Sequence, residues 1–245
     1  MKDRFSSHAR QYAAFRPTYP AELYDFIFSH LDQFATAWDA GTGNGQVARD
    51  LARKFNSVMA TDVSPQQLTN AHPADNIFYS LAAEETHFPD KTFNLITVAQ
   101  AIHWFDREKF YLEVKRVAKP EALLAVWGYG LVSIHQEIDS HLEHFYMQVV
   151  GPYWDKERKL VDEEYRTILF PFQEIHVPEF TFSMEWTLEE FQGYLNTWSA
   201  VQKYIQANQE NPVDTFIQRV RHLWGLERQT VHFPLFLRLG SIHQE

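Results

Sequence analysis

The 245-residue chain contains no cysteine. Disulfides, thiolate metal sites and a cysteine nucleophile are therefore excluded. No apolar run approaches the roughly 20 residues of a membrane-spanning helix, and residues 1–5 lack the apolar core of a secretory signal peptide. We therefore expect a cytoplasmic protein without a membrane partner.

Positive charge is also scarce, because 22 Lys and Arg residues face 32 Asp and Glu residues, for a formal net charge of −10. Binding to a nucleic-acid backbone depends on clustered Lys and Arg side chains. The densest basic segments, 115–119 and 219–228, are interrupted and are typical of solvated helix faces. The charge balance argues against DNA or RNA as a partner.

Several catalytic signatures are missing as well. The chain has no G-x-S-x-G elbow, no G-x-x-x-x-G-K-[ST] loop and no H-E-x-x-H pair. Three histidines with Glu137 fall on one expected helix within 135–144, but His-rich helices are more often solvated. We expect no metal site.

The most informative segment that is present is the run W-D-A-G-T-G-N-G-Q at 38–46. Asp39 ends an apolar strand, and Gly41, Gly43 and Gly45 follow at every second position, where a ligand can approach the backbone closely. A strand, a glycine turn and a helix N-terminus form a nucleotide-type cradle. The dinucleotide fingerprint needs a third glycine where this chain has Gln46. The pattern D-x-G-x-G-x-G instead resembles the first motif of class I S-adenosylmethionine-dependent methyltransferases.

Apolar strands alternate with helical patterns over residues 35–127, which predicts an α/β fold with a parallel sheet and crossover helices. We expect strands near 35–39, 57–62, 76–80, 93–98 and 121–127, and helices near 21–34, 46–55, 65–71 and 106–118. Later segments predict helices over 131–165, 187–206 (capped by Thr187 with Glu190) and 212–224, and strands over 174–182, 230–233 and 235–239. Without a repeat or linker, residues 1–245 are expected to form a single domain.

Asp62 ends the second expected strand, about twenty residues after the glycine run. A carboxylate at that place can accept hydrogen bonds from both hydroxyls of a ribose. The alternative is that Asp62 only caps the helix that begins at Ser64-Pro65.

The loop after the third expected strand reads A-A-E-E-T-H-F-P-D at 82–90. In class I methyltransferases the matching loop holds the adenine, often through an acidic side chain. Ala82 replaces the aspartate that relatives carry, so the resemblance implies an adenine contact through the Ala83 backbone and Glu84. Alternatively, these acids are only surface charge.

The fourth expected strand ends before Gln100, His103 and Trp104, which places them at the lip of the same crevice. Gln100 is expected to contact the cofactor. His103 is our catalytic candidate, because a histidine there can orient an acceptor or take its proton. The alternative is a packed His-Trp pair that shapes the pocket wall. Asp106 fits a helix cap.

The N-terminal segment is rich in aromatic residues and proline. Arg16 suits the carboxylate of a methionine moiety, and Tyr12 and Tyr19 could cover a sulfonium cation. Alternatively, Arg16 pairs with Glu22 or Asp25 on the surface.

Together with A-Q-A-x-H-W-F-D at 99–106 and T-W-S-A-V at 197–201, these segments resemble one branch of the class I methyltransferases, which contains trans-aconitate methyltransferase. The resemblance extends over nearly the whole chain. It implies a Rossmann-like three-layer sandwich with a seven-stranded, mostly parallel sheet whose last strand is antiparallel. It also implies N-terminal cover helices over 1–32, a cofactor-binding core over 33–130, and an acceptor-site cover with closing strands over 131–245.

The predicted activity is methyl transfer from S-adenosyl-L-methionine to a small-molecule acceptor, with oxygen of a carboxylate preferred. Asp39 and Gly41 would anchor the methionine amino group, and Gly43 belongs to the same cofactor loop. Candidate anchors for an acceptor carboxylate are the arginines of the second half, Arg166, Arg219, Arg221 and Arg238. The alternatives are a non-catalytic S-adenosylmethionine-binding protein and, less favoured, an NAD-dependent oxidoreductase. We expect a monomer.

Overall fold

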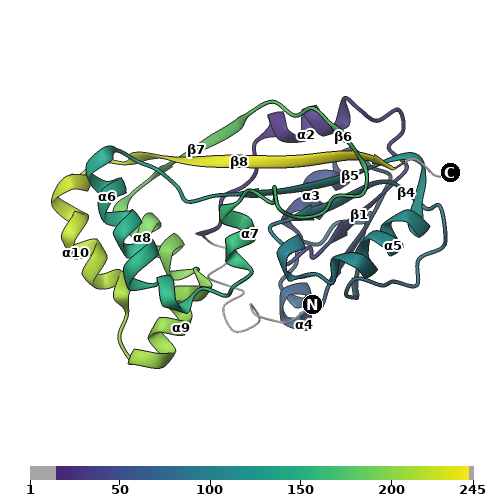
Figure 1. Cartoon of the computed structure of the whole chain (residues 1–245). Helices are drawn as coiled ribbons and strands as arrows, with labels where there is room; N and C mark the ends of the chain where they lie inside the picture. Colours follow the sequence, from purple (N-terminus) through teal and green to yellow (C-terminus); the bar gives the residue numbers. More distant parts are fainter. Residues whose placement is uncertain (1–14, 243–245) are drawn as a thin grey trace.

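A computed structural model describes residues 15–242 of the chain (Figure 1). Its centre is an eight-stranded sheet. The strands are β1 (Thr36–Ala40), β2 (Ser57–Asp62), β3 (Ile77–Leu81), β4 (Phe93–Ala99), β5 (Ala118–Tyr129), β6 (Gln173–Ile175), β7 (Phe180–Trp186) and β8 (Gln229–Ile242).

The strand order is β3-β2-β1-β4-β5-β8-β6, with β7 also paired to β8. Strands β1 to β5 are parallel, and β8 runs antiparallel to β5. Strands β6 and β7 pair in turn with successive parts of β8, at 239–241 and 229–235. The expected strand at 174–182 is therefore two separate strands, β6 and β7, which both pair with β8. The sheet thus has eight strands, one more than the seven implied by the resemblance.

The helices of the first half are α2 (Ala21–Phe28), α3 (Gln46–Ala52), α4 (Pro65–Thr69) and α5 (Arg107–Val117), with a short 3-10 turn η2 (Ile102–Trp104). Neighbouring residues of a strand point to opposite faces of a sheet. In β1, Ala37 packs into the core that contains α2 and α3, whereas Trp38 and Ala40 pack into the core that contains α5. Helices on both faces confirm the predicted α/β arrangement.

The second half supplies most of a helical cover at one end of the long strands β5 and β8 (Figure 1). Its elements are α6 (Gln136–His144), the π-type turn η3 (Phe145–Val149), η4 (Gly151–Tyr153), α7 (Arg158–Asp162), α8 (Leu188–Asn196), α9 (Ser199–Asn208) and α10 (Pro212–Trp224). The continuous helices expected over 131–165 and 187–206 are therefore broken. Within residues 15–242, no helix has the length and apolar character needed to cross a bilayer.

Candidate active site

The glycine loop joins β1 to α3 and is fastened to the neighbouring strand β2. The backbone N–H groups of Gly41 and Thr42 both donate to the Thr61 carbonyl, at 2.8 and 2.9 Å. Gly41, Gly43 and Gly45 all adopt positive φ angles, of +71°, +57° and +79°, which side chains disfavour. A Cβ on Gly41 would lie 2.7 Å from the Ala101 side chain, whereas one on Gly43 would meet nothing within 4 Å. The loop is therefore packed at its start and open at Gly43.

Asp39 lies beneath this loop and is only 1% exposed. Its carboxylate accepts hydrogen bonds from the hydroxyls of Thr42, at 2.5 Å, and Thr97, at 2.8 Å. Burial raises the pKa of Asp39 to about 6, although both hydrogen bonds act against that rise. The side chain thus supports the loop from within the protein, and direct contact with a ligand remains a prediction.

Asp62 stands at the carboxyl end of β2, beside the open part of the loop. Its carboxylate accepts one hydrogen bond from the Gly43 N–H and one from the Ser64 N–H, each of 2.9 Å. The cap of α4 is Ser64, whose hydroxyl accepts from the Gln67 N–H. The alternative that Asp62 caps this helix is therefore wrong.

The loop at 82–90 is fastened to α5. Glu84 is 6% exposed, and its carboxylate accepts a 2.8 Å hydrogen bond from the Asp106 N–H, so the surface-charge alternative is wrong for Glu84. Glu113 of α5 accepts from the backbone and hydroxyl of Thr86. Arg116 donates to the Phe88 carbonyl at 2.7 Å. Its side chain therefore holds this loop against α5, and is not the solvated charge expected for the segment 115–119. Ala83 is half-buried in the same loop.

Gln100 directly follows β4 and has a φ of +54°, unusual for a residue with a side chain. Its N–H donates to the Trp127 carbonyl at 2.9 Å, and its side-chain amide donates to the Tyr129 carbonyl at 3.3 Å. Such an outlier is typical of functional sites. Asp106 caps α5 as predicted, by accepting from the Lys109 N–H.

His103 lies in η2 and is 7% exposed. Its Nδ1 is 2.7 Å from the Tyr165 hydroxyl, and its ring packs 4.7 Å from the Trp104 ring. Burial, together with the nearby Arg158 and Arg107, lowers the pKa of His103 to about 3. The imidazole is therefore neutral at physiological pH and is a weak base.

Arg16 reaches the same region from the N-terminal segment. Its Nη1 donates to the Tyr129 hydroxyl at 2.7 Å, and its guanidinium lies 5.6 Å from the centre of the Tyr194 ring. Gln46, the residue in the third glycine position, donates to the Pro17 carbonyl at 2.9 Å and so ties this segment to α3. Tyr12 lies outside the described residues, and its predicted contact stays a prediction.

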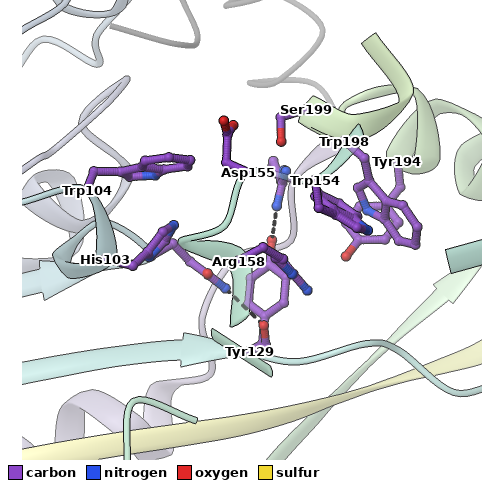
Figure 2. Close-up of a pocket in the computed structure, with 11 residues that line it drawn as sticks. His103, Trp104, Tyr129, Trp154, Asp155, Arg158, Tyr194, Trp198 and Ser199 are labelled. Carbon is purple, nitrogen blue, oxygen red and sulfur yellow. Dashed lines mark hydrogen bonds between the residues drawn. The ribbon is translucent and has the colours of Figure 1, made fainter. Parts of the chain in front are cut away.

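These elements enclose a pocket (Figure 2), with His103 and Trp104 on one side and Trp154, Trp198 and Tyr194 on the other. The full lining comprises Arg16, Gln100, His103, Trp104, Tyr129, Trp154, Asp155, Arg158, Tyr194, Trp198 and Ser199. None of the four arginines expected to anchor an acceptor lines it. Arg238, for example, donates to the Tyr165 carbonyl and pairs with Glu174.

Arg158 also lines the pocket, although no pattern in the sequence indicates it. Its Nε donates to the Tyr146 hydroxyl at 2.7 Å and lies 3.2 Å from the Asp162 carboxylate, and its guanidinium is 4.8 Å from the centre of the Trp154 ring. Burial disfavours its charge, but Tyr146 and Asp162 outweigh that effect and the pKa of Arg158 is raised. Within residues 15–242 its terminal nitrogens have no hydrogen-bond partner. An anion bound in the pocket can accept hydrogen bonds from these terminal nitrogens.

The loop fits a nucleoside cofactor because space beside Gly43 is open and the Asp62 carboxylate borders it. The sequence of residues 38–126 matches the family model of the methyltransferase domain. A methyltransferase-family protein of Dictyostelium discoideum is 34% identical over 249 residues, which cover 98% of this chain and 95% of that protein. A solved structure of a type II methyltransferase-family protein from Anaeromyxobacter dehalogenans has a TM-score of 0.87 at 33% identity, covering 94% of this chain and 100% of that one.

More distant structures agree in fold. The phosphoethanolamine N-methyltransferase 2 of Haemonchus contortus, solved with S-adenosylhomocysteine and phosphomonomethylethanolamine, has a TM-score of 0.50 at 15% identity, covering 98% of this chain and 58% of that one. The fold and the glycine loop define a class I S-adenosylmethionine-dependent methyltransferase. The chain belongs to this family, and its cofactor is S-adenosylmethionine.

Proposed function

We propose that the protein transfers the methyl group to a carboxylate oxygen of a small-molecule acid. The observation that carries this proposal is Arg158, a charged guanidinium whose Nε is held by Tyr146 and Asp162 while the residue lines the pocket beside His103. S-adenosylmethionine, when bound, supplies a methyl group on a positively charged sulfur whose leaving group is a neutral thioether. A carboxylate is ionised at pH 7 and attacks without a general base.

The residues of the pocket would then bind and orient the acid. Arg158 would hold one carboxylate by charge-assisted hydrogen bonds, and His103 stays neutral beside it. The indoles of Trp104, Trp154 and Trp198 would exclude water from the reacting groups. Fixing two reactants in line can supply about 7–11 kcal/mol of the barrier, so positioning can provide much of the catalysis.

The cofactor would lie across the carboxyl ends of β1, β2 and β4. In this proposal Arg16 and Gln100 face its methionine end, and Asp62 accepts from the ribose hydroxyls. Ala83 and Glu84 border the adenine. Asp39 acts through the loop that it supports, since its oxygens already accept from Thr42 and Thr97.

A radiochemical assay tests the proposal. S-adenosylmethionine with a labelled methyl group is incubated with the protein and a panel of carboxylic acids, phenols and amines. A product that loses its label in mild base is an ester and supports the proposal. A base-stable product would overturn carboxyl methylation, and cofactor binding without turnover on any compound would favour a non-catalytic binding protein.

Arg158→Ala should raise the KM for the acid roughly 10- to 100-fold, because hydrogen bonds to a charged group contribute about 1.5–3 kcal/mol. The dissociation constant for S-adenosylhomocysteine, measured by calorimetry, should stay within about twofold. Arg158→Lys should recover only part of the loss, since an ammonium cannot bind a carboxylate in the same two-pronged way.

Arg166→Ala serves as the matched control, because Arg166 is exposed and pairs with Glu164 away from this pocket. Its KM should equal that of the wild type. An unchanged KM in Arg158→Ala would remove Arg158 from the acceptor site.

A further inference from the structure

Two consecutive residues after α7 have left-handed backbones, Glu164 with φ +54° and Tyr165 with φ +58°. Residues with a side chain adopt this conformation at an energetic cost, which the surroundings must offset. The turn is closed by a 2.8 Å hydrogen bond from the Tyr165 N–H to the Leu160 carbonyl. As a result the Tyr165 side chain is 0% exposed and its hydroxyl meets His103.

Arg238 of β8 braces this turn from the other side. Its Nη1 donates to the carbonyls of Tyr165, at 2.9 Å, and Ile168, at 2.6 Å, and its Nη2 donates to Glu174 at 2.6 Å. The Tyr165 ring also packs edge-to-face on Phe236, with 5.0 Å between ring centres. The phenol is thus fixed by its backbone and its ring.

The second ring nitrogen of His103 has a different environment. Nδ1 lies at the Tyr165 hydroxyl, whereas Nε2 has no hydrogen-bond partner in the described part of the chain. His103 lines the acceptor pocket (Figure 2), so Nε2 is the nitrogen that can meet a ligand there. The hydrogen on a neutral imidazole sits on one nitrogen only, and the partner of the other nitrogen decides which.

We propose that Tyr165 is a positioning residue, whose hydroxyl donates to Nδ1 of His103 and holds the proton of the imidazole on Nε2. His103 then presents an N–H donor to the acceptor pocket, next to Arg158. This role rests on the proposed carboxyl methylation and deepens it, because a carboxylate needs donors and no base. The Nε2–H would bind the carboxylate oxygen that does not attack, and orient the one that does.

The lowered pKa of His103 agrees with this role. An imidazole that stays neutral donates a hydrogen bond without competing for the proton of a ligand. Arg158 and Tyr165 also stand at the two ends of the short segment 158–165, which includes α7. One segment therefore provides both the proposed anion anchor and the group that orients His103.

The test uses nitrogen-15 NMR on the full chain with labelled histidine, which reports the protonated ring nitrogen directly. His103→Gln identifies the His103 signals by their loss. The wild type should show the Nε2–H form, and Tyr165→Phe, which keeps the ring and its packing, should shift His103 toward a mixture of both forms. The Nδ1–H form in the wild type, or an unchanged His103 spectrum in Tyr165→Phe, would overturn the proposal.

Kinetics provide the second readout. Tyr165→Phe should lower kcat on an accepted acid about tenfold, as expected for a lost orienting hydrogen bond, with the dissociation constant for S-adenosylhomocysteine unchanged. Tyr111→Phe is the matched control, because Tyr111 is 6% exposed in the same core cluster and its hydroxyl has no partner among the described residues. It should change neither the His103 spectrum nor kcat.

The two proposals fail separately. If the wild type shows the Nε2–H form and Tyr165→Phe alters it, but no acid is methylated, the positioning role stands and carboxyl methylation falls. If an acid is methylated while His103 is in the Nδ1–H form, carboxyl methylation stands and the positioning role falls.

Discussion

The Asp39 carboxylate supports the glycine loop through hydrogen bonds, but burial disfavours its charged form. It closes the base of the glycine loop by accepting hydrogen bonds from Thr42 and Thr97, yet its burial raises its pKa to about 6. In the unfolded chain an aspartate has a pKa near 3.9. Between about pH 4 and pH 6 the folded protein therefore binds more protons at this site than the unfolded chain does.

This difference predicts that the Asp39 carboxylate costs stability as the pH rises. The cost is absent below pH 4, grows between pH 4 and 6, and is complete above pH 6. At about 1.4 kcal/mol per pKa unit it approaches about 3 kcal/mol. Asp39→Asn keeps the shape of the side chain and can hydrogen-bond both threonines, so its free energy of unfolding relative to the wild type should rise from pH 4 to pH 7.

Urea unfolding of both proteins at pH 4.5, 5.5 and 7 measures that difference. Asp75→Asn is a suitable control, because Asp75 is an exposed aspartate before β3 and away from the glycine loop. A difference between Asp39→Asn and the wild type that does not vary with pH would contradict the assignment.

Residue by residue, the sequence indicated those members of the candidate site whose positions depend on local pattern. Asp39 and Asp62 lie at strand ends, Gln100 directly follows β4, and the glycines fill the loop between β1 and α3. A motif and the alternation of elements place all of them. Arg158 and Tyr165 could not be found in this way. Tyr165 meets His103 across 62 residues of sequence, and only the folded cover brings α7 to that place.

Helix caps are the feature that local sequence predicts best at the scale of elements. Thr187 and Glu190 form the predicted capping box, in which each side chain accepts from the backbone N–H of the other. The predicted helix at 212–224 is α10, capped by Asn211. Side chains within one turn make these bonds, so no distant contact is needed.

The same region shows where local sequence is insufficient. The expected helix at 187–206 is interrupted between α8 and α9, because Trp198 has an extended backbone. Its indole is 4% exposed and packs against Tyr146 and Trp154, at 5.7 Å between ring centres in each case. Tertiary packing of this aromatic cluster overrides the helical periodicity, and no pattern in the segment itself reports that packing.

Thr187→Ala should lower the free energy of unfolding by about 1 kcal/mol, since the helix loses its N-terminal hydrogen-bond acceptor. Glu190 also pairs with Arg228 at 2.7 Å, so Glu190→Ala should cost at least as much. The double variant should cost less than the sum of both, because the two bonds belong to one box.

Chemical denaturation of the four proteins at pH 7 measures these values. Ser140→Ala, an exposed position inside α6, should change stability by less than about 0.5 kcal/mol. Strict additivity of Thr187→Ala and Glu190→Ala would contradict the coupled box.

At the scale of the whole molecule, the pocket is built from both halves of the chain. The first half contributes Tyr129 of β5 and, from the segment after β4, Gln100 and His103, whereas the cover contributes Arg158 and Trp198. The alternation of strands and helices over 35–127 predicts the parallel strands β1 to β5. The cover, and the pairing of both β6 and β7 with β8, depend on contacts between distant segments. Sequence therefore predicts the parallel strands and the position of the glycine loop better than the helical cover and the pocket beneath it.

Binding of the cofactor should raise the free energy of unfolding of the chain. A ligand at 100 times its dissociation constant adds about 2.7 kcal/mol to the free energy of unfolding. Asp62→Ala removes the proposed ribose acceptor and also the partner of the Gly43 and Ser64 N–H groups. We expect the dissociation constant for S-adenosylhomocysteine to rise at least tenfold, which removes about 1.4 kcal/mol of that added stability at a fixed concentration.

Thermal unfolding with and without S-adenosylhomocysteine separates the two effects of the substitution. Lost support for the loop lowers the midpoint of the free protein, whereas lost ribose binding reduces the rise that the ligand produces. Asp75→Ala, an exposed position before β3, should leave both values as in the wild type. If Asp62→Ala lowers the midpoint of the free protein but keeps the full ligand-induced rise, Asp62 only braces the glycine loop and its assignment to the ribose is wrong.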